Sequence, residues 1–371
     1  MPDRSASPDG CVCAVLPPRA TSSLNRPLRI LHVSSFTFTR LRGACFHSVG
    51  YKLSNGLTRL GHSVLNFGDR ELARSLNPFG SRKFGRGAVN KLLLQTCEIV
   101  RPDLLLLGHA DMITAATLSA ARQRDPTMRL AQWNVDALFV EDNVNRIRSK
   151  LASVDVTFVS TGGERLQALA STGHAIAFLP NPVDSSIETG RNFAANELST
   201  DLFFAVGHPD QPRFHAGVQR SPRGLRALLE SRIPAIRCHI PGVPPDRHLV
   251  GHLYQSALES ARCGLNFSRR NDDYLYSSDR LTHLIGNGLL TFIDRATGYS
   301  DIFSDEEMAF YSTEDELIEK MICFLANDQA LRRVAKAGWT RYHALFNCER
   351  VADYVIGVLY EKYDPLTFRW H

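Results

Sequence analysis

Long apolar runs are missing from this sequence of 371 residues. No stretch approaches the ~20 consecutive apolar residues with which a helix crosses a bilayer, so a membrane-spanning helix is not expected. The N-terminal apolar patch, residues 11–16, is shorter than the apolar core of a signal peptide, which has ~7–15 residues. The Ser, Pro and Asp content of residues 1–26 instead predicts a disordered leader. These absences predict a cytoplasmic protein.

Closely spaced metal-binding cysteines are also missing. The eight cysteines are scattered, and the one close pair, Cys11 and Cys13, has no second pair to complete a zinc site. Free thiols in a reducing compartment explain these residues better. Asp272 and Asp273 are weak candidates for a cation site, because a lone pair of acids in a loop offers too few oxygen ligands. The sequence therefore predicts no metal and no bound cofactor.

A dinucleotide fingerprint is absent as well. No GxGxxG follows the first expected strand, residues 28–34, so the glycine pattern that admits a nicotinamide or flavin pyrophosphate is lacking. The net charge is also modest, because 43 basic and 38 acidic residues leave only +5. This charge does not require a nucleic acid partner. It fits anionic substrates, or peripheral contact with the anionic inner face of a membrane.

What the sequence does contain is a regular alternation of short apolar runs with amphipathic helical segments. This alternation is typical of doubly wound α/β folds. The chain is too long for one ordinary core, so we expect two domains, residues 27–184 and 200–350. Residues 69–87 are expected to form a basic loop, either solvated or in contact with an anionic or membrane-borne acceptor. The expected strands are 28–34, 63–67, 104–107, 129–133, 154–159 and 175–179, then 201–206, 235–240, 264–267, 289–293 and 308–311.

The stretch 263–303 suits a phosphate group. A short apolar run predicts a strand, a polar loop with two arginines follows, and a helix begins at about Arg280. A helix N-terminus flanked by arginines is a favourable site for a phosphate. The residues concerned are Arg269, Arg270 and Asn271 in the loop, Ser277, Ser278 and Asp279 as N-caps, and Gly286, Asn287 and Gly288 in the turn that ends the helix.

Residues from about 253 to 355 also follow a familiar order of motifs. The first motif is an Asn-containing strand, and an arginine that begins a helix follows it. A glycine-rich turn, an acidic F-x-x-x-E segment, a Glu-Leu pair and a terminal A-x-x-G then come in order, and an arginine follows the last of them. The residues in these places are Leu265 and Asn266, Arg280, Gly286 to Gly288, Phe303 with Glu307, Glu316 with Leu317, Ala335 with Gly338, and Arg350. This segment resembles the C-terminal domain of the glycosyl transferases group 1 superfamily, particularly its CgeB-like branch of spore-maturation proteins.

The resemblance implies the GT-B plan, an α/β fold in which two Rossmann-like domains face a cleft. The second domain would bind a nucleotide-sugar donor, the first would bind the acceptor, and the C-terminal helix within 351–371 would pack back onto the first. The implied activity is that of a bacterial glycosyltransferase of polysaccharide biosynthesis, metal-independent and retaining. Its acceptor would be a hydroxyl of a glycan, lipid-linked or other cell-surface molecule.

The ends of the expected strands supply the remaining site candidates, because ligands of doubly wound sheets bind beyond the carboxyl ends of strands. His109 and Asp136 follow two strands of the first domain, and either could accept the acceptor's proton. The alternatives are a structural histidine and a helix N-cap. The expected donor-binding residues are Gly207, His208, Arg269, Arg270, Asn271, Ser278, Arg280, His283, Gly286, Asn287 and Gly288.

One position departs from the family pattern. The family commonly has Phe-Glu at the second and third positions after the arginine, and the glutamate holds the donor's ribose, whereas this sequence has Thr282 and His283. A histidine cannot replace a carboxylate that accepts bonds from two hydroxyls. Two alternatives therefore stay open: a catalytically inactive sugar-binding or scaffold protein, and a GT-B sugar-nucleotide epimerase.

Overall fold

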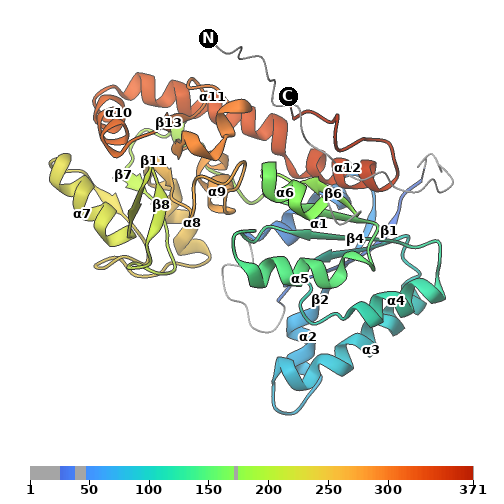
Figure 1. Cartoon of the computed structure of the whole chain (residues 1–371). Helices are drawn as coiled ribbons and strands as arrows, with labels where there is room; N and C mark the ends of the chain where they lie inside the picture. The colour runs from blue at the N-terminus through green and yellow to red at the C-terminus, as the bar shows by residue number, and fades with distance from the viewer. Residues whose placement is uncertain (1–25, 38–46, 171–173, 371) are drawn as a thin grey trace, which may run out of the picture.

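The structure is a computed structural model that describes residues 26–37, 47–170 and 174–370. The leader expected over residues 1–26 lies outside the described residues, except for Arg26. Figure 1 shows two lobes, each built around its own sheet. Within the described ranges, no helix combines the length and apolarity that a membrane crossing requires.

The first lobe contains a six-stranded parallel sheet in the order β2-β1-β3-β4-β5-β6. Its strands occupy the expected segments, because continuous apolar runs bury both faces of a parallel sheet. Leu104 and Leu106 of β3 join the core on one face of the sheet, and Leu105 and Leu107 join the core on the other. The strands are β1 (Arg29–Ser34), β2 (Ser63–Gly68), β3 (Leu104–Gly108), β4 (Arg129–Asn134), β5 (Val156–Val159) and β6 (Ala175–Phe178).

Helices cover both faces of this sheet. Residues of α1 share a core with the C-terminal helix α12 (Cys348–Leu359), and residues of α3 and α4 share the core on the opposite face. The first-lobe helices are α1 (Val49–Arg59), α2 (Asp69–Ser75), α3 (Arg82–Val100), α4 (Ala115–Arg124), α5 (Glu141–Leu151) and α6 (Gly163–Ala170).

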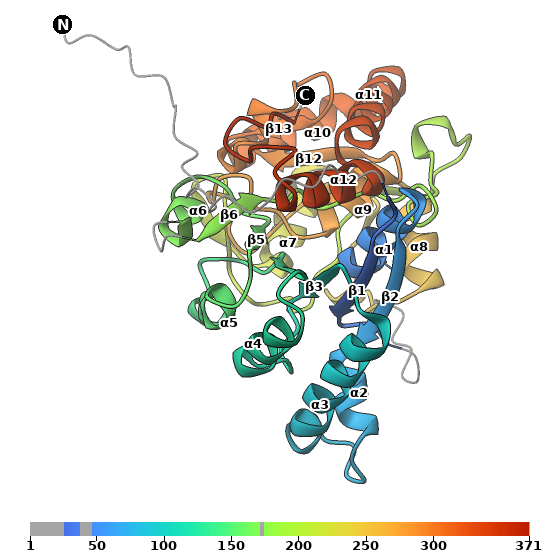
Figure 2. The ribbon, with the colours of Figure 1, turned by 90° about the vertical axis from the view of Figure 1, so that its right-hand side faces the viewer.

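The expected basic loop over residues 69–87 is wrong, because α2 and the first turns of α3 occupy it. The two helices approach closely at Gly85, where a Cβ atom would lie 1.6 Å from the carbonyl oxygen of Ala73. Val89 and Leu93 continue the buried stripe from Gly85 at helical spacing. The glycine that the sequence pattern marked as a loop residue is therefore the contact point of a helical hairpin, which projects from the lobe (Figure 2).

The second lobe contains a five-stranded parallel sheet in the order β10-β7-β11-β12-β13. Its core on one face includes residues of α7, α10 and α11, and its core on the other includes residues of α8 and α9. The strands are β7 (Thr200–Phe203), β10 (Cys238–His239), β11 (Ala261–Asn266), β12 (Leu290–Asp294) and β13 (Ala309–Tyr311). The helices are α7 (Pro222–Arg232), α8 (His252–Glu259), α9 (Arg280–Gly286), α10 (Glu314–Ala326) and α11 (Asp328–Phe346).

Short elements complete this lobe. The antiparallel hairpin of β8 (Arg213–His215) and β9 (Val218–Arg220) was not expected from the sequence. Thr313 is the N-cap of α10, because its hydroxyl accepts a hydrogen bond from the Glu316 amide at 3.1 Å. Three single-turn 3₁₀ helices are η2 (Asn192–Ala194), η3 (Arg295–Thr297) and η4 (Tyr299–Asp301).

The last helix, α12 (Cys348–Leu359), lies on the first lobe although α11 belongs to the second (Figure 1). A Cβ atom at Gly56 of α1 would lie 2.1 Å from the Cys348 carbonyl oxygen, so glycine is what allows α1 and α12 to touch. Arg59 of α1 donates to Glu349 at 3.2 Å. The chain therefore connects the lobes twice, through residues 179–199 and at the start of α12.

Candidate functional site

A pocket of about 360 Å³ lies beyond the carboxyl ends of β7 and β11. Ligands of doubly wound sheets bind at this end of the strands. Four of the expected donor-binding residues line it, and four further residues were missed by the sequence analysis. The expected ones are His208, Arg269, Ser278 and Arg280, and the missed ones are Gln211, Arg213, Ser268 and Tyr276.

Three guanidinium groups converge on this pocket. The Phe267 carbonyl accepts from both Arg213 and Arg280, the latter at 3.3 Å. Within the described part of the chain, no carboxylate forms an ion pair with Arg213, Arg269 or Arg280. Uncompensated like charges at close range favour a ligand with more than one negative charge.

Arg213 is the most deeply buried of the three. Burial lowers the pKa of Arg213 to about 9, and the nearby charges of Arg280 and Arg269 act in the same direction. Its guanidinium lies 5.3 Å from the centre of the Phe267 ring, and its Nε is buried without a hydrogen-bond partner. An anion in the pocket would offset the repulsion among the three guanidinium groups, and it would accept a hydrogen bond from the unpartnered Nε of Arg213.

The expected helix caps are not formed as predicted. Asp279 occupies the N-cap position of α9 but makes no side-chain cap bond, while Ser278 accepts from Arg280 at 3.2 Å and Ser277 bonds Tyr299 at 3.0 Å. The helix itself has only seven residues. Arginine side chains, rather than a long helix dipole, supply the positive charge of this pocket.

Arg270 and Asn271 do not line the pocket. Arg270 pairs with Asp272 at 2.9 Å and lies 5.6 Å from the Phe214 ring centre. Asn271 is buried and donates to the carbonyls of Phe214 and Ser268, at 2.8 and 3.1 Å. Both residues therefore tie the loop after β11 to the β8–β9 hairpin that carries Arg213.

The Gly286-Asn287-Gly288 turn also lies outside the pocket. Asn287 accepts from the Gly190 amide at 2.9 Å. Gly288, at φ 78°, faces the Phe193 ring so closely that a Cβ atom would lie 2.7 Å from it. The turn holds the segment between the two sheets. Gly207, whose neighbour His208 lines the pocket, has open space around its Cα.

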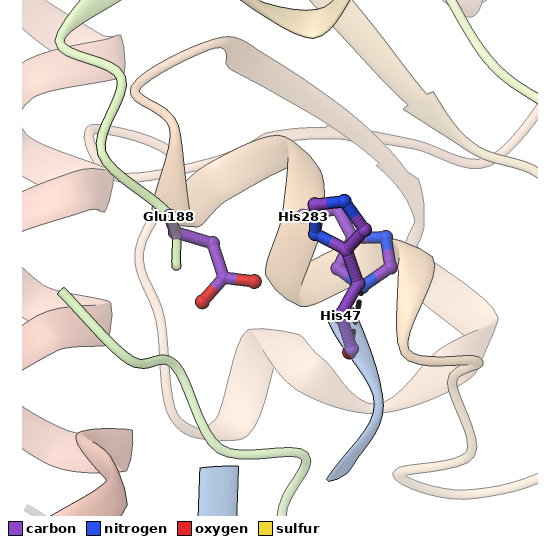
Figure 3. Close-up of side chains that lie close together, drawn as sticks. All are labelled: His47, Glu188 and His283. Carbon is purple, nitrogen blue, oxygen red and sulfur yellow. Dashed lines mark hydrogen bonds between the residues drawn. The ribbon is translucent and has the colours of Figure 1, made fainter. Parts of the chain in front are cut away.

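His283 lies at the junction of the lobes, in a buried cluster with His47 and Glu188 (Figure 3). Its Nδ1 is 3.1 Å from the Tyr254 hydroxyl, and its Nε2 is 3.4 Å from the His47 carbonyl oxygen. Burial, followed by the charge of Lys52, lowers the pKa of both histidines, so both rings are neutral at neutral pH. His283 is thus a contact between the lobes and does not line the donor pocket.

The same cluster has the residue types of a metal site, since one ligand atom from each of the three residues lies within 4.8 Å of the others. However, the ammonium of Lys52 lies 2.5 Å from a Glu188 carboxylate oxygen, and both side chains are fully buried. A divalent cation would have to displace this ammonium. Within the cluster, the negative charge of Glu188, which lies between the two lobes, is therefore already balanced by Lys52 of the first lobe.

Replacing Glu188 with glutamine should strongly destabilise the protein. The change leaves the Lys52 ammonium buried without a counter-charge, which typically costs about 3–5 kcal/mol. Urea denaturation followed by tryptophan fluorescence would measure the change in the free energy of unfolding. The control is Glu349→Gln at the half-exposed Arg59 pair, expected to cost less than about 1 kcal/mol. Equal effects of the two substitutions would contradict this assignment.

On the facing lobe, the two expected catalytic residues lie together. His109 Nδ1 is 3.3 Å from Asp136 Oδ2, and Arg146 donates to the same oxygen at 3.0 Å. Burial disfavours the charge of Asp136, but the hydrogen bond and charge of His109 and the charge of Arg146 outweigh it and lower the pKa. Asp136 is therefore ionised at neutral pH and can orient the His109 ring.

The loop after β4 brings this pair toward the donor pocket. Phe139, three residues after Asp136, has its ring 5.6 Å from the Tyr276 ring and 5.3 Å from the Arg269 guanidinium carbon. Arg165 of α6 and Asp273 form a 2.7 Å ion pair between the lobes, so the two acids at 272 and 273 both pair with arginines. The loop that follows Asp136 therefore contacts two residues of the pocket lining, Arg269 and Tyr276.

Residues 220–357 match the sequence model of a family described as glycosyl transferase-like. No significantly similar sequence was found among curated proteins.

Solved structures with low sequence identity share the fold over most of the chain. The N-terminal domain of Candida albicans trehalose-6-phosphate phosphatase has a TM-score of 0.58 at 9% identity, covering 95% of this chain and 100% of that one. Anabaena HepE, in complex with UDP and glucose, has a TM-score of 0.56 at 11% identity, covering 90% and 100%. An Escherichia coli structure described as trehalose-6-phosphate bound with UDP-2-fluoro glucose has a TM-score of 0.54 at 12% identity, covering 90% and 99%.

The two parallel sheets and these neighbours establish an α/β fold of two Rossmann-like domains. The family match falls on the lobe that holds the arginine-lined pocket. The chain therefore has two Rossmann-like domains, and its residues 220–357 resemble a glycosyl transferase-like family.

Proposed function

We propose that this protein transfers a sugar from a nucleotide-sugar donor to a hydroxyl group of an acceptor. The observation that carries the proposal is the pocket with Arg213, Arg269 and Arg280, none of which forms an ion pair with a carboxylate of the described residues. A nucleoside diphosphate has the matching charge and size. Two fold neighbours are described with UDP and glucose or with UDP-2-fluoro glucose, which supports a donor of this class.

The donor's diphosphate would lie against the three arginines, which stabilise the departing nucleoside diphosphate without a metal. His208, Gln211 and Tyr276 would offer hydrogen bonds to the ribose or the sugar. We propose that Arg270, Asn271, His283 and the 286–288 turn position the pocket without touching the donor. In particular, His283 contacts the other lobe, so the ribose contact of the family glutamate must come from another residue.

Across the cleft, His109 would receive the proton of the acceptor hydroxyl while Asp136 holds the ring. As the sugar–acceptor bond forms, the sugar–phosphate bond breaks and its electrons remain with the nucleoside diphosphate. Retention of the anomeric configuration is part of the proposal through the resemblance to the group 1 superfamily and its CgeB-like branch. The proposed acceptor is a glycan, lipid-linked or other cell-surface molecule, made at the cytoplasmic face of a bacterial membrane.

A panel of UDP-, GDP-, CMP- and dTDP-sugars tests this proposal, with thermal shift reporting binding and nucleotide release reporting turnover. We expect one nucleotide class to raise the melting temperature and to be released as its diphosphate when an acceptor glycan is added. Binding without release for any acceptor would favour the scaffold alternative. That alternative stays open because His283, which stands at the position of the family glutamate, does not line the pocket. A changed sugar nucleotide formed without acceptor would favour an epimerase.

A further inference from the structure

Two large aromatic side chains are exposed to solvent at the tip of the α2–α3 hairpin. Phe79 is 78% exposed and Phe84 is 67% exposed, and their ring centres are 5.6 Å apart. Figures 1 and 2 show this hairpin projecting from the first lobe in both views. A pair of exposed phenylalanines in contact forms an apolar patch, and such a patch on a projecting element is typical of an interaction site.

The tip is held in this conformation by specific contacts. The Asn77 side chain donates to the carbonyls of Ala73 and Ser81, at 2.7 and 2.8 Å, and accepts from the amides of Phe79 and Ser81, each at 3.2 Å. The contact of Gly85 with Ala73 joins the two helices directly beneath the turn. The phenylalanines are therefore presented by a braced turn.

The surroundings of the two rings carry one sign of charge. Residues 72–97 contain five basic residues and no acidic residue. Four of the five, Arg82, Lys83, Arg86 and Lys91, are exposed along α3. Exposed aromatics flanked by cations are the combination that binds an anionic lipid surface, because the rings enter the headgroup region while the cations meet lipid phosphates.

We propose that the α2–α3 tip docks onto an anionic lipid bilayer, with Phe79 and Phe84 inserted among the headgroups and the cations of α3 against them. A second copy of the chain is a poorer occupant, since two identical tips would bring clusters of like charge together. The docking itself does not depend on the proposed transfer activity.

The hairpin is also tied to the acceptor side of the cleft, a link that rests on the proposed function. Asn90 of α3 donates to the Met112 carbonyl at 2.8 Å, and Met112 follows the strand-end loop that carries His109. Arg70 of α2 pairs with Asp111 in the same loop. Docking of the tip would therefore bring His109 close to a lipid-linked acceptor.

Vesicle co-sedimentation of the full chain tests the docking. We expect binding to phosphatidylcholine vesicles that contain about one-third phosphatidylglycerol, weak binding to pure phosphatidylcholine, and loss of binding at high salt. Phe79→Ser/Phe84→Ser should weaken binding at least about tenfold. Arg82→Glu/Lys83→Glu should weaken it by a similar factor.

Two controls match these variants. Ile99→Ser replaces an 84% exposed apolar residue near the other end of α3. Arg333→Glu/Lys336→Glu makes the same change in net charge on exposed positions of α11, in the other lobe. Both should bind as the unmodified protein does. Circular dichroism should show that all variants are folded, because every replaced side chain is exposed.

Three results would overturn the proposal: no binding of the unmodified chain to anionic vesicles, equal weakening by the α11 control, or unchanged binding of both tip variants. A dimer in size-exclusion chromatography that the Phe79→Ser/Phe84→Ser change converts to a monomer would also overturn it, by assigning the tip to contact between two copies. If the protein binds vesicles but turns over no donor, the result would contradict only the proposed function.

Discussion

Replacing both Arg213 and Arg280 with methionine should lower kcat/KM for the nucleotide-sugar donor by at least about 10⁴-fold, since one donor aimed at developing charge typically contributes 10²–10³. Both guanidinium groups share the Phe267 carbonyl and line the same pocket, so the diphosphate would lose two of its three cations. Steady-state kinetics with the donor found in the panel would measure the loss. Calorimetry should show a parallel loss of nucleotide affinity.

The same double variant should keep its fold. Burial and like charge lower the pKa of Arg213, which means that its charge is unfavourable in the absence of an anion. The unliganded variant is therefore expected to melt at or above the temperature of the unmodified protein. Arg223→Met/Arg295→Met is the control, because those arginines pair with Asp210 and Asp305 outside the pocket. A loss of activity in this control comparable to that of the pocket variant would contradict the assignment.

Replacing Asp136 with asparagine should lower kcat by about 10²–10⁴, the usual contribution of a positioned acid–base group. Asparagine has nearly the shape of aspartate, but it carries no negative charge. It therefore cannot stabilise the His109 ring once that ring has accepted the proton. The KM for the donor should change by less than about threefold, because this residue lies on the lobe opposite the donor pocket. Rapid-quench measurement of a single turnover would separate chemistry from product release.

Glu141→Gln provides the matched control for this change. The Glu141 carboxylate is exposed at the start of α5, a few residues from Asp136, and pairs with exposed Arg148. It should leave kcat within about twofold of the unmodified value. If Asp136→Asn instead raised the donor KM and spared kcat, the residue would belong to donor binding and the proposed roles would be wrong.

The strands of both sheets were predictable because each needs only a short apolar run. Leu104 to Leu107 are buried on both faces of a parallel sheet, so four adjacent leucines already indicate a central strand. The strand-end positions of His109 and Asp136 were predictable for the same reason. Their contact was not predicted, and it follows from the pairing of β3 with β4.

Features that depend on contacts between distant segments could not be predicted. Arg213 lies on a three-residue strand, too short to show a period. Its hairpin is held at the pocket by the loop after β11, where Asn271 donates to the Phe214 carbonyl and Phe214 donates to the Arg269 carbonyl. Gly85 resembles a loop residue until Ala73 packs against it. His283 stands at the position where the family it resembles commonly has a glutamate, yet its ring meets Tyr254 and His47 rather than the pocket.

The central proposal is that the three arginines bind a diphosphate, and calorimetric titration with the nucleotide identified by the panel tests it most directly. The nucleoside diphosphate, its monophosphate and the free nucleoside would be compared at one ionic strength. We predict at least about tenfold tighter binding of the diphosphate than of the monophosphate, because each added negative charge meets an arginine that no carboxylate of the described residues neutralises. Equal affinities for the three compounds, or no binding of any nucleoside diphosphate, would contradict the proposal.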